Sequence, residues 1–411
     1  MNQKKCRFCG ARLKHSFADL GMSPFANSNV DPDRLNQIEP FYPLHAFVCE
    51  QCFLVQLEEF ETPMHIFSDY VYFSSFSDSW VQHAKNYVEM IVERLSLNQH
   101  SQVVEIASND GYLLQFFVAS GIPVLGIEPA ANVASRAVEK GISTLVKFFG
   151  TAAAKELVAG GMRADLIIGN NVLAHVPALN DFVEGLKILL RHKGVVTMEF
   201  PHLLRLMEEQ QFDTIYHEHF SYFSFITVNK VFAHHGLTIF DVEELLTHGG
   251  SLRVYARHTG DEAKSTSSRV TSLLEREDNA RLTSLDPYLA FTEQVKATKR
   301  DLLRFLINAK EDGKSIVAYS APAKGNTLLN YCGIRSDFID YVVDRSPYKQ
   351  GRYLPGTHIP IYHPDKINET KPDYLLLLAW NLRDEIMSKM THVREWRCSF
   401  VTPIPKVRIY S

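Results

Sequence analysis

Four of the six cysteines fall in two closely spaced pairs near the amino end of the chain. Cys6 and Cys9 form one C-x-x-C motif, and Cys49 and Cys52 form a second. In a reducing compartment, two such motifs indicate a metal site rather than a set of disulfides. Four thiolates match the tetrahedral coordination of a closed structural Zn²⁺. We therefore predict a zinc-binding module over residues 1–65.

A second concentration of reactive side chains lies at residues 215–224, which read IYHEHFSYFS. Histidine is the natural general base near neutral pH. In a helix or a turn, Tyr216, His219 and Tyr222 would share one face at a spacing of three. In an extended segment, Tyr216 and Glu218 would lie on one side and the two histidines on the other. The segment alone is compatible with an acid–base centre, a metal site or an aromatic core segment with polar tips.

Polar side chains also follow three apolar runs that have the character of buried strands. The run at 103–107 ends in Ser108-Asn109-Asp110-Gly111, the run at 123–127 ends in Glu128, and a third ends in Asn170-Asn171. The carboxyl ends of parallel strands meet at one edge of a sheet, where such folds bind ligands. We expect these side chains to meet a ligand at that edge.

Glu128 and the turn that precedes it bear on the identity of the cofactor. A carboxylate at this strand end can accept hydrogen bonds from both hydroxyls of a ribose, which suits NAD and S-adenosylmethionine equally. The turn reads EIASNDG and lacks the G-x-G-x-x-G pattern by which backbone approaches a pyrophosphate. Acidic and amide groups suit a sulfonium and an amino-acid tail. The residues therefore favour S-adenosylmethionine over NAD.

The elements that must position these residues alternate between strand-like and helix-like patterns. A helical spacing of apolar residues begins at about Trp80, and strand–helix repeats follow it. A second alternation begins near residue 315, after a polar helical stretch at about 262–310. Such alternation predicts α/β architecture with parallel sheets. We predict a zinc-binding module (1–65), a central Rossmann-like domain that binds S-adenosylmethionine (66–255), and a second Rossmann-like domain at the carboxyl end (256–411).

Composition narrows the class of protein further. The chain has 411 residues and a formal net charge of −4, and 45% of it is hydrophobic. No basic tract of the kind that binds nucleic acid is present. No apolar stretch approaches the roughly 20 residues that span a bilayer, and the start MNQKKCRFCG has no apolar stretch behind its charges. We expect a cytoplasmic monomer that binds neither nucleic acid nor membranes.

Six segments, taken together and in order, resemble one enzyme family. They are the C-x-x-C pairs, VVEIASNDGYLL, GIEPAANVA, NNVLAHVPALNDF, YHEHFSY and SAPAKGNTLLNY. Over essentially the whole chain they resemble the zinc-containing C-methyltransferases that act at C-3′ of nucleotide-linked 4-keto-deoxyhexoses. The family turn usually reads E-I-G-S-N-D-G, whereas this chain has Ala107 in place of the glycine. If that position requires positive φ, alanine costs stability.

The resemblance implies an activity and the residues that carry it out. The activity is methyl transfer from S-adenosylmethionine to C-3′ of a nucleotide-diphospho-4-keto-6-deoxyhexose, through an enolate formed by a histidine base. His219 corresponds to the base, Tyr216 acts with it, and Glu218 orients or tunes a neighbour. His175 faces the sugar near its keto oxygen, and Tyr72 approaches the reacting sugar from the aromatic stretch before the first helix.

Further residues are predicted to hold the two ligands. The cofactor residues are Tyr70, Ser74, Ser75, Glu105, Ser108, Asn109, Asp110, Glu128, Pro129, Asn132, Asn170 and Asn171. The substrate residues are Tyr222, Lys324 and Asn326, of which Lys324 and the turn around it suit a diphosphate.

Three other interpretations compete with this one. A catalytic metal could lie between His202, His217 and His219, but H-E-H is not the H-E-x-x-H zinc motif. An NAD-dependent sugar-nucleotide oxidoreductase could use the second α/β region, which also lacks the dinucleotide glycines. A non-enzymatic zinc-containing interaction protein would leave Asp110 and Glu128 unexplained. Titration with S-adenosylmethionine and NAD separates these alternatives.

Overall fold

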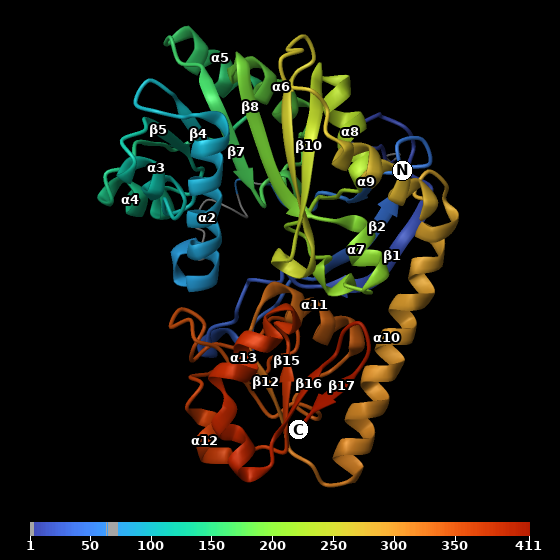
Figure 1. Ribbon diagram of the computed structural model, residues 1–411. Helices are drawn as coiled ribbons and strands as arrows, with labels where there is room; N and C mark the ends of the chain where they lie inside the picture. Colours follow the sequence, from blue (N-terminus) through green and yellow to red (C-terminus); the bar gives the residue numbers. More distant parts are fainter. Residues whose placement is uncertain (1–3, 63, 65–72) are drawn as a thin grey trace.

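The computed structural model describes residues 4–62, Met64 and residues 73–411, which form three sheets with helices around them (Figure 1). Parallel strands alternate with helices in two of these sheets, as predicted. The α/β fold class is therefore confirmed.

The central sheet has seven strands in the described part of the chain, of which six run in one direction and β11 runs in the opposite direction. Its spatial order is β10 (Leu237–Leu245), β11 (Ser251–His258), β8 (Leu190–Pro201), β7 (Ala164–Asn170), β4 (Val103–Ile106), β5 (Val124–Ile127) and β6 (Thr144–Leu145). β11 ends at His258, beyond the boundary predicted at residue 255. We propose that this domain extends to the end of β11.

Both faces of the central sheet are buried, which explains the continuous apolar runs of its strands. Val103 of β4 faces α2 (Asp78–Leu95) and α3 (Leu114–Ala119), and Val104 faces the opposite layer. The first layer continues with α4 (Ala131–Glu139). The opposite layer contains α5 (Thr151–Ala159), α6 (Leu179–Leu189), α8 (Phe225–His234) and α9 (Ser268–Asn279).

The helical spacing seen before the first strand corresponds to α2. Its buried residues Ala84, Tyr87, Val88 and Ile91 recur at spacings of three and four. The hydroxyl of Ser77 accepts the backbone N–H of Trp80 at 3.4 Å and caps the helix, and Ser96 ends it in the left-handed conformation.

The cysteine-containing region folds onto a small antiparallel sheet. Its order is β1 (His15–Ser23), β2 (Tyr42–Val48), β3 (Val55–Leu57) and β9 (Ser221–Tyr222). β9 belongs to the histidine-containing segment, and Tyr222 pairs with Val55. The zinc-binding module and the predicted catalytic segment are therefore parts of one sheet.

The third sheet lies in the carboxyl-terminal part of the chain and is parallel except for its last strand. Its order is β14 (Ile361–Tyr362), β13 (Val342–Val343), β12 (Ile316–Tyr319), β15 (Tyr374–Leu377), β16 (Ser399–Thr402) and β17 (Arg408–Tyr410). The helices α11 (Ala323–Cys332), α12 (Lys366–Thr370) and α13 (Arg383–Lys389) accompany it.

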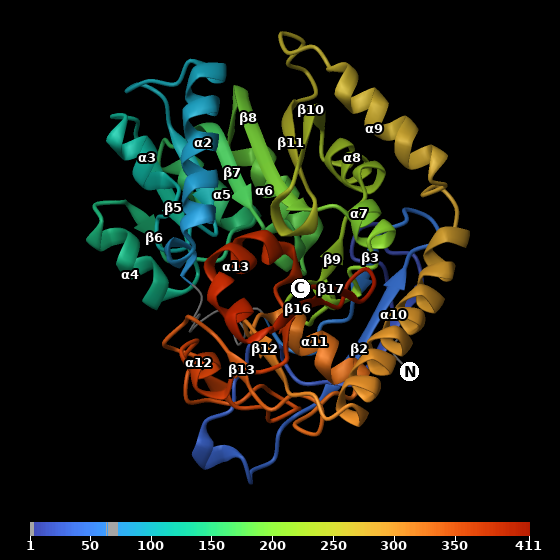
Figure 2. The ribbon, with the colours of Figure 1, turned by 60° about the horizontal axis from the view of Figure 1, so that its bottom comes forward.

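The long helix α10 (Asp286–Glu311) joins the upper and lower parts of the molecule (Figure 1 and Figure 2). It runs beside β1, where the rings of Phe17 and Phe291 stack at 4.6 Å and Thr292 donates to the Phe17 carbonyl at 2.9 Å. Short segments complete the fold: α7 (Leu203–Glu208) and the 3-10 turns Pro32–Arg34, Ser74–Phe76, Leu173–His175, Phe212–Thr214, Thr247–Gly249, Trp380–Leu382 and Thr391–Trp396.

Candidate active site and metal centre

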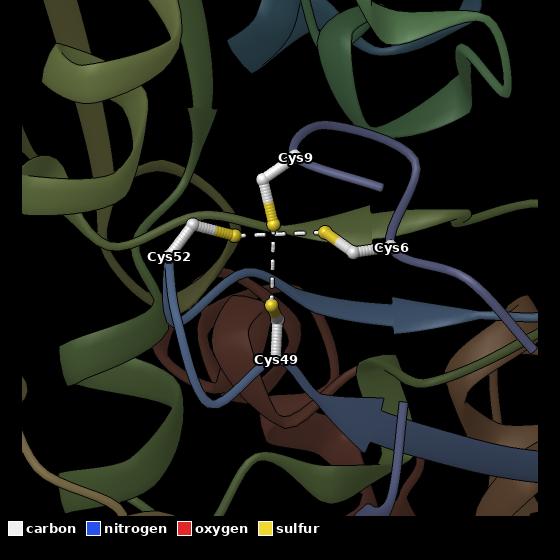
Figure 3. A group of neighbouring side chains, drawn as sticks. All are labelled: Cys6, Cys9, Cys49 and Cys52. Atoms are coloured by element: carbon white, nitrogen blue, oxygen red, sulfur yellow. Dashed lines mark hydrogen bonds between the residues drawn. The ribbon is translucent and has the colours of Figure 1, made fainter. Parts of the chain in front are cut away.

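The four predicted metal ligands lie together at one end of the small sheet (Figure 3). Their sulfur atoms lie within 4.8 Å of one another, and the Cys6–Cys52 and Cys9–Cys49 pairs are 3.5 Å apart. Four sulfurs around a zinc ion at about 2.3 Å are separated by roughly 3.8 Å. The donor set and its spacing therefore fit a structural Zn²⁺.

Each cysteine pair is carried by a tight loop that needs one left-handed residue. The first loop has Gly10 there, at φ 75°, whereas the second has Phe53 at φ 65°. A bulky side chain is strained in this region. Phe53 packs on the rest of the protein, because its ring stacks on Tyr288 of α10 at 6.0 Å and lies 5.2 Å from the Lys230 ammonium.

A cavity of about 770 Å³ lies between the carboxyl edge of the central sheet and the carboxyl-terminal sheet. One wall is formed by residues that follow β4, β5 and β7, and the opposite wall begins at Pro322, three residues after the end of β12. The segment 214–219 closes a third side. All three regions that carried predicted site residues therefore border one space.

Six of the predicted cofactor residues line this cavity: Ser74, Asn109, Glu128, Pro129, Asn170 and Asn171. The Glu128 carboxylate accepts the backbone N–H groups of Asn109 at 3.0 Å and Ala130 at 2.9 Å. Burial raises the pKa of Glu128, and these two N–H groups oppose the rise. The carboxylate is thereby fixed at the end of β5, where it faces the cavity.

The turn after β4 places two left-handed residues beside Glu128. Ala107 has φ 56° and Asn109 has φ 49°. The position at which the related enzymes usually carry glycine therefore does require positive φ in this chain. Asparagine enters this region more readily than alanine, so the strain of the turn is concentrated at Ala107. The side chain of Asn109 accepts the backbone N–H of Ser74 at 2.8 Å.

Five other predicted cofactor residues do not line the cavity: Ser75, Glu105, Ser108, Asp110 and Asn132. Their side chains support the turn or face away from it. Asp110 accepts from the Ser75 hydroxyl and lies 3.4 Å from the Lys140 ammonium. Ser108 points at Gly126, and Asn132 is exposed on α4. Neighbouring residues in a strand or turn point to opposite sides, so the motif cannot place all of its polar residues at the ligand.

Two predicted tyrosines, Tyr70 and Tyr72, lie outside the described residues. The other four predicted catalytic residues, Tyr216, His219, His175 and Glu218, all line the cavity.

The histidine-containing segment is neither a helix nor a strand at its centre. Residues 216–219 form a turn closed by the His219 N–H and the Tyr216 carbonyl at 2.9 Å, and the short strand β9 follows. The turn places the two side chains side by side, with Tyr216 Oη 2.8 Å from His219 Nε2. His219 Nδ1 lies 3.1 Å from the Thr214 carbonyl.

These contacts fix the tautomer of His219. A carbonyl oxygen can only accept, so Nδ1 carries the proton, and Nε2 is left to accept from the Tyr216 hydroxyl. Burial, together with the neighbouring His175, lowers the pKa of His219 well below its ordinary value. The imidazole is therefore neutral near neutral pH and has its basic nitrogen beside Tyr216.

His175 stands next to this pair. Its ring centroid lies 4.7 Å from that of His219, and its Nδ1 donates to the Glu218 carbonyl at 2.8 Å. Burial lowers the pKa of His175 to about 4. His175 is therefore also neutral, and its tautomer is fixed by the main chain of the turn.

Glu218 is buried at the same turn, and Asn27 Nδ2 donates to its Oε1 at 2.7 Å. Burial raises the pKa of Glu218 to about 7, and the Asn27 amide and the Lys349 charge oppose the rise. The carboxyl group therefore titrates near neutral pH, where it can exchange a proton.

The opposite wall supplies positive charge. Lys324, near the start of α11, donates to Asn381 Oδ1 at 2.9 Å and lies 4.6 Å from the Trp380 ring. Burial lowers the pKa of Lys324, and the nearby Asp213 opposes this. Lys349, which follows β13, donates to the Ala321 carbonyl at 2.8 Å.

Two of the three predicted substrate residues lie away from the cavity. Tyr222 is buried in β9, because the turn ends at His219 and the chain then becomes extended. Asn326 is buried inside α11, where its Oδ1 accepts from Asn330 at 3.2 Å. Two residues correspond to roughly 200° around a helix, so Asn326 points away from the side that bears Lys324.

The histidine metal site has no support within the described residues, in which the four cysteines are the only cluster of metal-ligating side chains found. His202 Nε2 is instead 2.6 Å from the Glu277 carboxylate. His217 Nε2 donates to the Pro43 carbonyl at 3.3 Å, and burial lowers the pKa of His217 to about 4.

Several residues of the cavity were missed by sequence reasoning: Asn27, Trp80, Phe149, His248 and Lys349. Asn27 comes from the loop between the cysteine pairs, and only the fold brings it to the active site. His248 begins a His-Gly-Gly sequence, and the two glycines could have indicated a tight hairpin tip. Burial and the Lys324 charge lower the pKa of His248 to about 4.

Three family models match successive parts of the chain. They are a zinc binding domain at 6–67, a methyltransferase domain at 80–242 and a C-methyltransferase C-terminal domain at 246–405. C-methyltransferase NovU of Streptomyces niveus is 34% identical over 410 residues, which is 99% of this chain and 97% of that protein. The chain belongs to the C-methyltransferase family. Methyl transfer from S-adenosylmethionine and the zinc-binding module of this C-methyltransferase are thereby confirmed.

Solved structures also resemble part of this C-methyltransferase. Magnesium protoporphyrin IX methyltransferase from Synechocystis PCC 6803 with bound SAH has a TM-score of 0.35 and 16% identity, and the match covers 43% of this chain and 82% of that one. The CcbJ methyltransferase from Streptomyces caelestis has a TM-score of 0.34 and 11% identity, with 43% and 90% covered. Similarity at this level does not establish a shared activity. No helix in the described part of the chain has both the length and the apolar character of a membrane span.

Proposed function

We propose that this C-methyltransferase methylates C-3′ of a nucleotide-diphospho-4-keto-6-deoxyhexose. The observation that carries the proposal is the Tyr216–His219 pair, with 2.8 Å between Oη and Nε2 and with Nδ1 held by the Thr214 carbonyl. Transfer to carbon requires a base that removes a proton and a donor that holds the resulting enolate oxygen. This pair provides both groups at one cavity wall.

S-adenosylmethionine supplies an electrophilic methyl group on a sulfonium. On the chain's side, Glu128 is positioned to accept hydrogen bonds from ribose hydroxyls, and Asn170 Nδ2 and Asn171 Oδ1 are buried atoms without a partner in the described part of the protein. These groups fit a cofactor that is both a donor and an acceptor of hydrogen bonds.

The proton chemistry follows from the fixed tautomer. When a ketone enters, the Tyr216 hydroxyl turns from His219 Nε2 to the C-4′ oxygen, and Nε2 becomes free to take the C-3′ proton. The C-3′–H bond breaks, its electron pair forms the enolate, and the Tyr216 hydroxyl stabilises the oxygen. The Nδ1 proton of His175 is held by the Glu218 carbonyl, so its Nε2 is an acceptor that can help to relay a proton. Because burial makes His219 a weak base, the hydrogen bond from Tyr216 must lower the pKa of the C-3′–H group of the substrate.

One observation favours a second candidate for the base. The pKa of Glu218 is about 7, which matches the ideal for a general base near neutral pH better than the lowered pKa of His219. We retain His219 as the base, because its nitrogen is already hydrogen-bonded to the group that would hold the enolate. We propose that Glu218 orients a neighbouring residue of the turn or tunes its pKa.

The substrate class is supported by the lysine-bearing wall. Lys324 and Lys349 line the cavity opposite Glu128, and α11 begins at Ala323 beside them. A helix amino terminus and two ammonium groups fit the negative charge of a diphosphate.

The two alternatives from the sequence, an NAD-dependent oxidoreductase and a non-enzymatic interaction protein, disagree with membership of a methyltransferase family. Monomeric state, absence of nucleic-acid binding and cytoplasmic location remain predictions.

A product analysis tests the proposal. Incubation with S-adenosylmethionine and a panel of 4-keto-6-deoxy sugar nucleotides should add one methyl group, and NMR of the product should place it on C-3′. Methylation at oxygen or nitrogen would contradict the proposal, as would methylation of none of these sugars by an enzyme that binds the cofactor.

A further inference from the structure

The hairpin between β10 and β11 brings a third imidazole into the cavity. His248 lies at its tip with φ 55°, followed by Gly249 at φ 90° and Gly250 at φ 118°. A histidine in the left-handed region is uncommon, and such strain is retained where the surrounding structure holds it for a purpose. None of the proton-transfer steps described above uses this residue.

His248 is held by a specific partner on the cofactor wall. The Asn171 amide lies 2.9 Å from His248 Nε2, and Asn171 itself is left-handed at φ 54°. Glu199 holds the two segments that carry the pair, because its carbonyl accepts the Asn171 N–H at 2.7 Å and its carboxylate accepts the hydroxyl of Thr247, next to His248, at 2.9 Å. Two left-handed residues from different elements therefore meet side chain to side chain.

The Asn171–His248 pair has hydrogen-bonding capacity left over. Asn171 Oδ1 is buried and has no partner in the described structure, and no protein partner for His248 Nδ1 is found there either. Because the Asn171 amide donates to Nε2, Nδ1 carries a proton, and the pair offers one donor and one acceptor. The opposite orientation of the amide exchanges the two roles but still leaves one of each.

The surroundings indicate which ligand uses this pair. The His248 ring meets Trp80 at 5.1 Å, and Trp80 stacks on Tyr112 at 6.0 Å, so both contacts belong to the side of the cavity that contains Asn109 and Ser74. A ligand that needs one donor and one acceptor on this side is the zwitterionic end of an α-amino acid.

We propose that Asn171 and His248 bind the amino-acid tail of S-adenosylmethionine. His248 donates from Nδ1 to the tail carboxylate, and Asn171 Oδ1 accepts from the α-ammonium. This assignment concerns the cofactor alone and does not depend on the sugar substrate or on the identity of the base.

Binding of two cofactor analogues tests the assignment without turnover. S-adenosylhomocysteine has the amino-acid tail, and methylthioadenosine lacks it. We expect His248→Gly to weaken binding of S-adenosylhomocysteine by roughly 10- to 100-fold in calorimetry, the cost of a hydrogen bond to a charged group. Methylthioadenosine should bind the variant and the unchanged enzyme equally well.

Two further variants separate loss of contact from loss of structure. Glycine and asparagine both tolerate the left-handed backbone at this position, and the asparagine amide reaches the place of Nδ1. His248→Asn should therefore recover part of the lost affinity. His258→Gln is a matched control on the same hairpin, because His258 Nε2 donates to the Leu190 carbonyl at 3.2 Å away from the cavity; it should bind both analogues normally.

Two results would overturn the proposal. Unchanged affinity of His248→Gly for S-adenosylhomocysteine would show that the imidazole does not bind the cofactor. An equal loss for both analogues would show that the variant disturbs the adenosine site or the fold rather than a contact to the tail.

Discussion

The two sheets that face each other across the cavity share an architecture but differ in chemistry. The central sheet brings Glu128, Asn109 and Asn171 to its carboxyl edge, whereas the carboxyl-terminal sheet brings Lys324 and Lys349 to its own. The first set suits a cationic cofactor and the second an anionic substrate. Similar α/β frames thus provide two half-sites of opposite preference, and the turn at 216–219 lies between them.

The largest effect is expected from a substitution in the first half-site, the edge of the central sheet that carries Glu128. Glu128→Ala should weaken binding of S-adenosylhomocysteine by about 100-fold, because it removes both the ribose acceptor and the carboxylate that holds the Asn109 and Ala130 N–H groups. Calorimetry measures this directly. The control Glu139→Ala, at an exposed pair with Arg136 on α4, should change nothing. Normal binding of S-adenosylhomocysteine by Glu128→Ala would show that the cofactor does not bind at this edge of the sheet.

A substitution in the second half-site should weaken binding of the sugar nucleotide without changing binding of the cofactor. Lys324→Met should raise the KM for the sugar nucleotide roughly 10-fold or more, because the diphosphate loses a charged donor. Binding of S-adenosylhomocysteine should stay the same. Lys366→Met, at the surface beside Glu369, serves as the matched control. Loss of cofactor binding in Lys324→Met would show that the two half-sites are not separate.

A smaller effect concerns the turn between the half-sites. The folded pKa of Glu218, about 7, lies above its unfolded value, so the folded state binds more protons between about pH 4.5 and 7 and loses stability as the pH rises through that window. Glu218→Gln keeps the acceptor for Asn27 and lacks this titration. The free energy of unfolding of the variant should therefore exceed that of the wild type by up to about 3 kcal/mol more at pH 7 than at pH 4.5.

Thermal unfolding of the wild type and Glu218→Gln across this pH range checks the prediction. A constant difference in stability would mean that Glu218 is ionised without penalty in the folded protein.

The smallest effect concerns the strained turn of the cofactor wall. Ala107→Gly should stabilise the protein by up to about 1 kcal/mol, because glycine relieves the left-handed strain but loses more entropy on folding. The same change at Ala297, inside α10, should destabilise it by about 1 kcal/mol. Chemical denaturation measures both variants, and the same sign for both would contradict the strain argument.

The sequence predicted most of the fold, since strand and helix patterns depend on local periodicity. β4, β5 and α2 lie where apolar spacing placed them, and the cysteine spacing predicted the metal centre. Each of these features is determined by residues that lie close to one another along the chain. Local pattern was therefore sufficient for these elements.

The direction of individual side chains was harder to predict. Asp110 and Ser108 belong to the correct turn but support it from behind, and Tyr222 follows His219 into a strand rather than a helix. Asn27 and His248 reach the cavity from loops distant in sequence. Such contacts depend on tertiary packing, which a motif does not encode.

Exchange of the C-3′ hydrogen with solvent tests the central claim most directly. In deuterated water with S-adenosylhomocysteine and a 4-keto-6-deoxy sugar nucleotide, the wild type should place deuterium at C-3′, because enolate formation needs no methyl group. His219→Asn should abolish this exchange, and Glu218→Gln should retain it. Exchange at the wild-type rate in His219→Asn would contradict the assignment of His219 as the base.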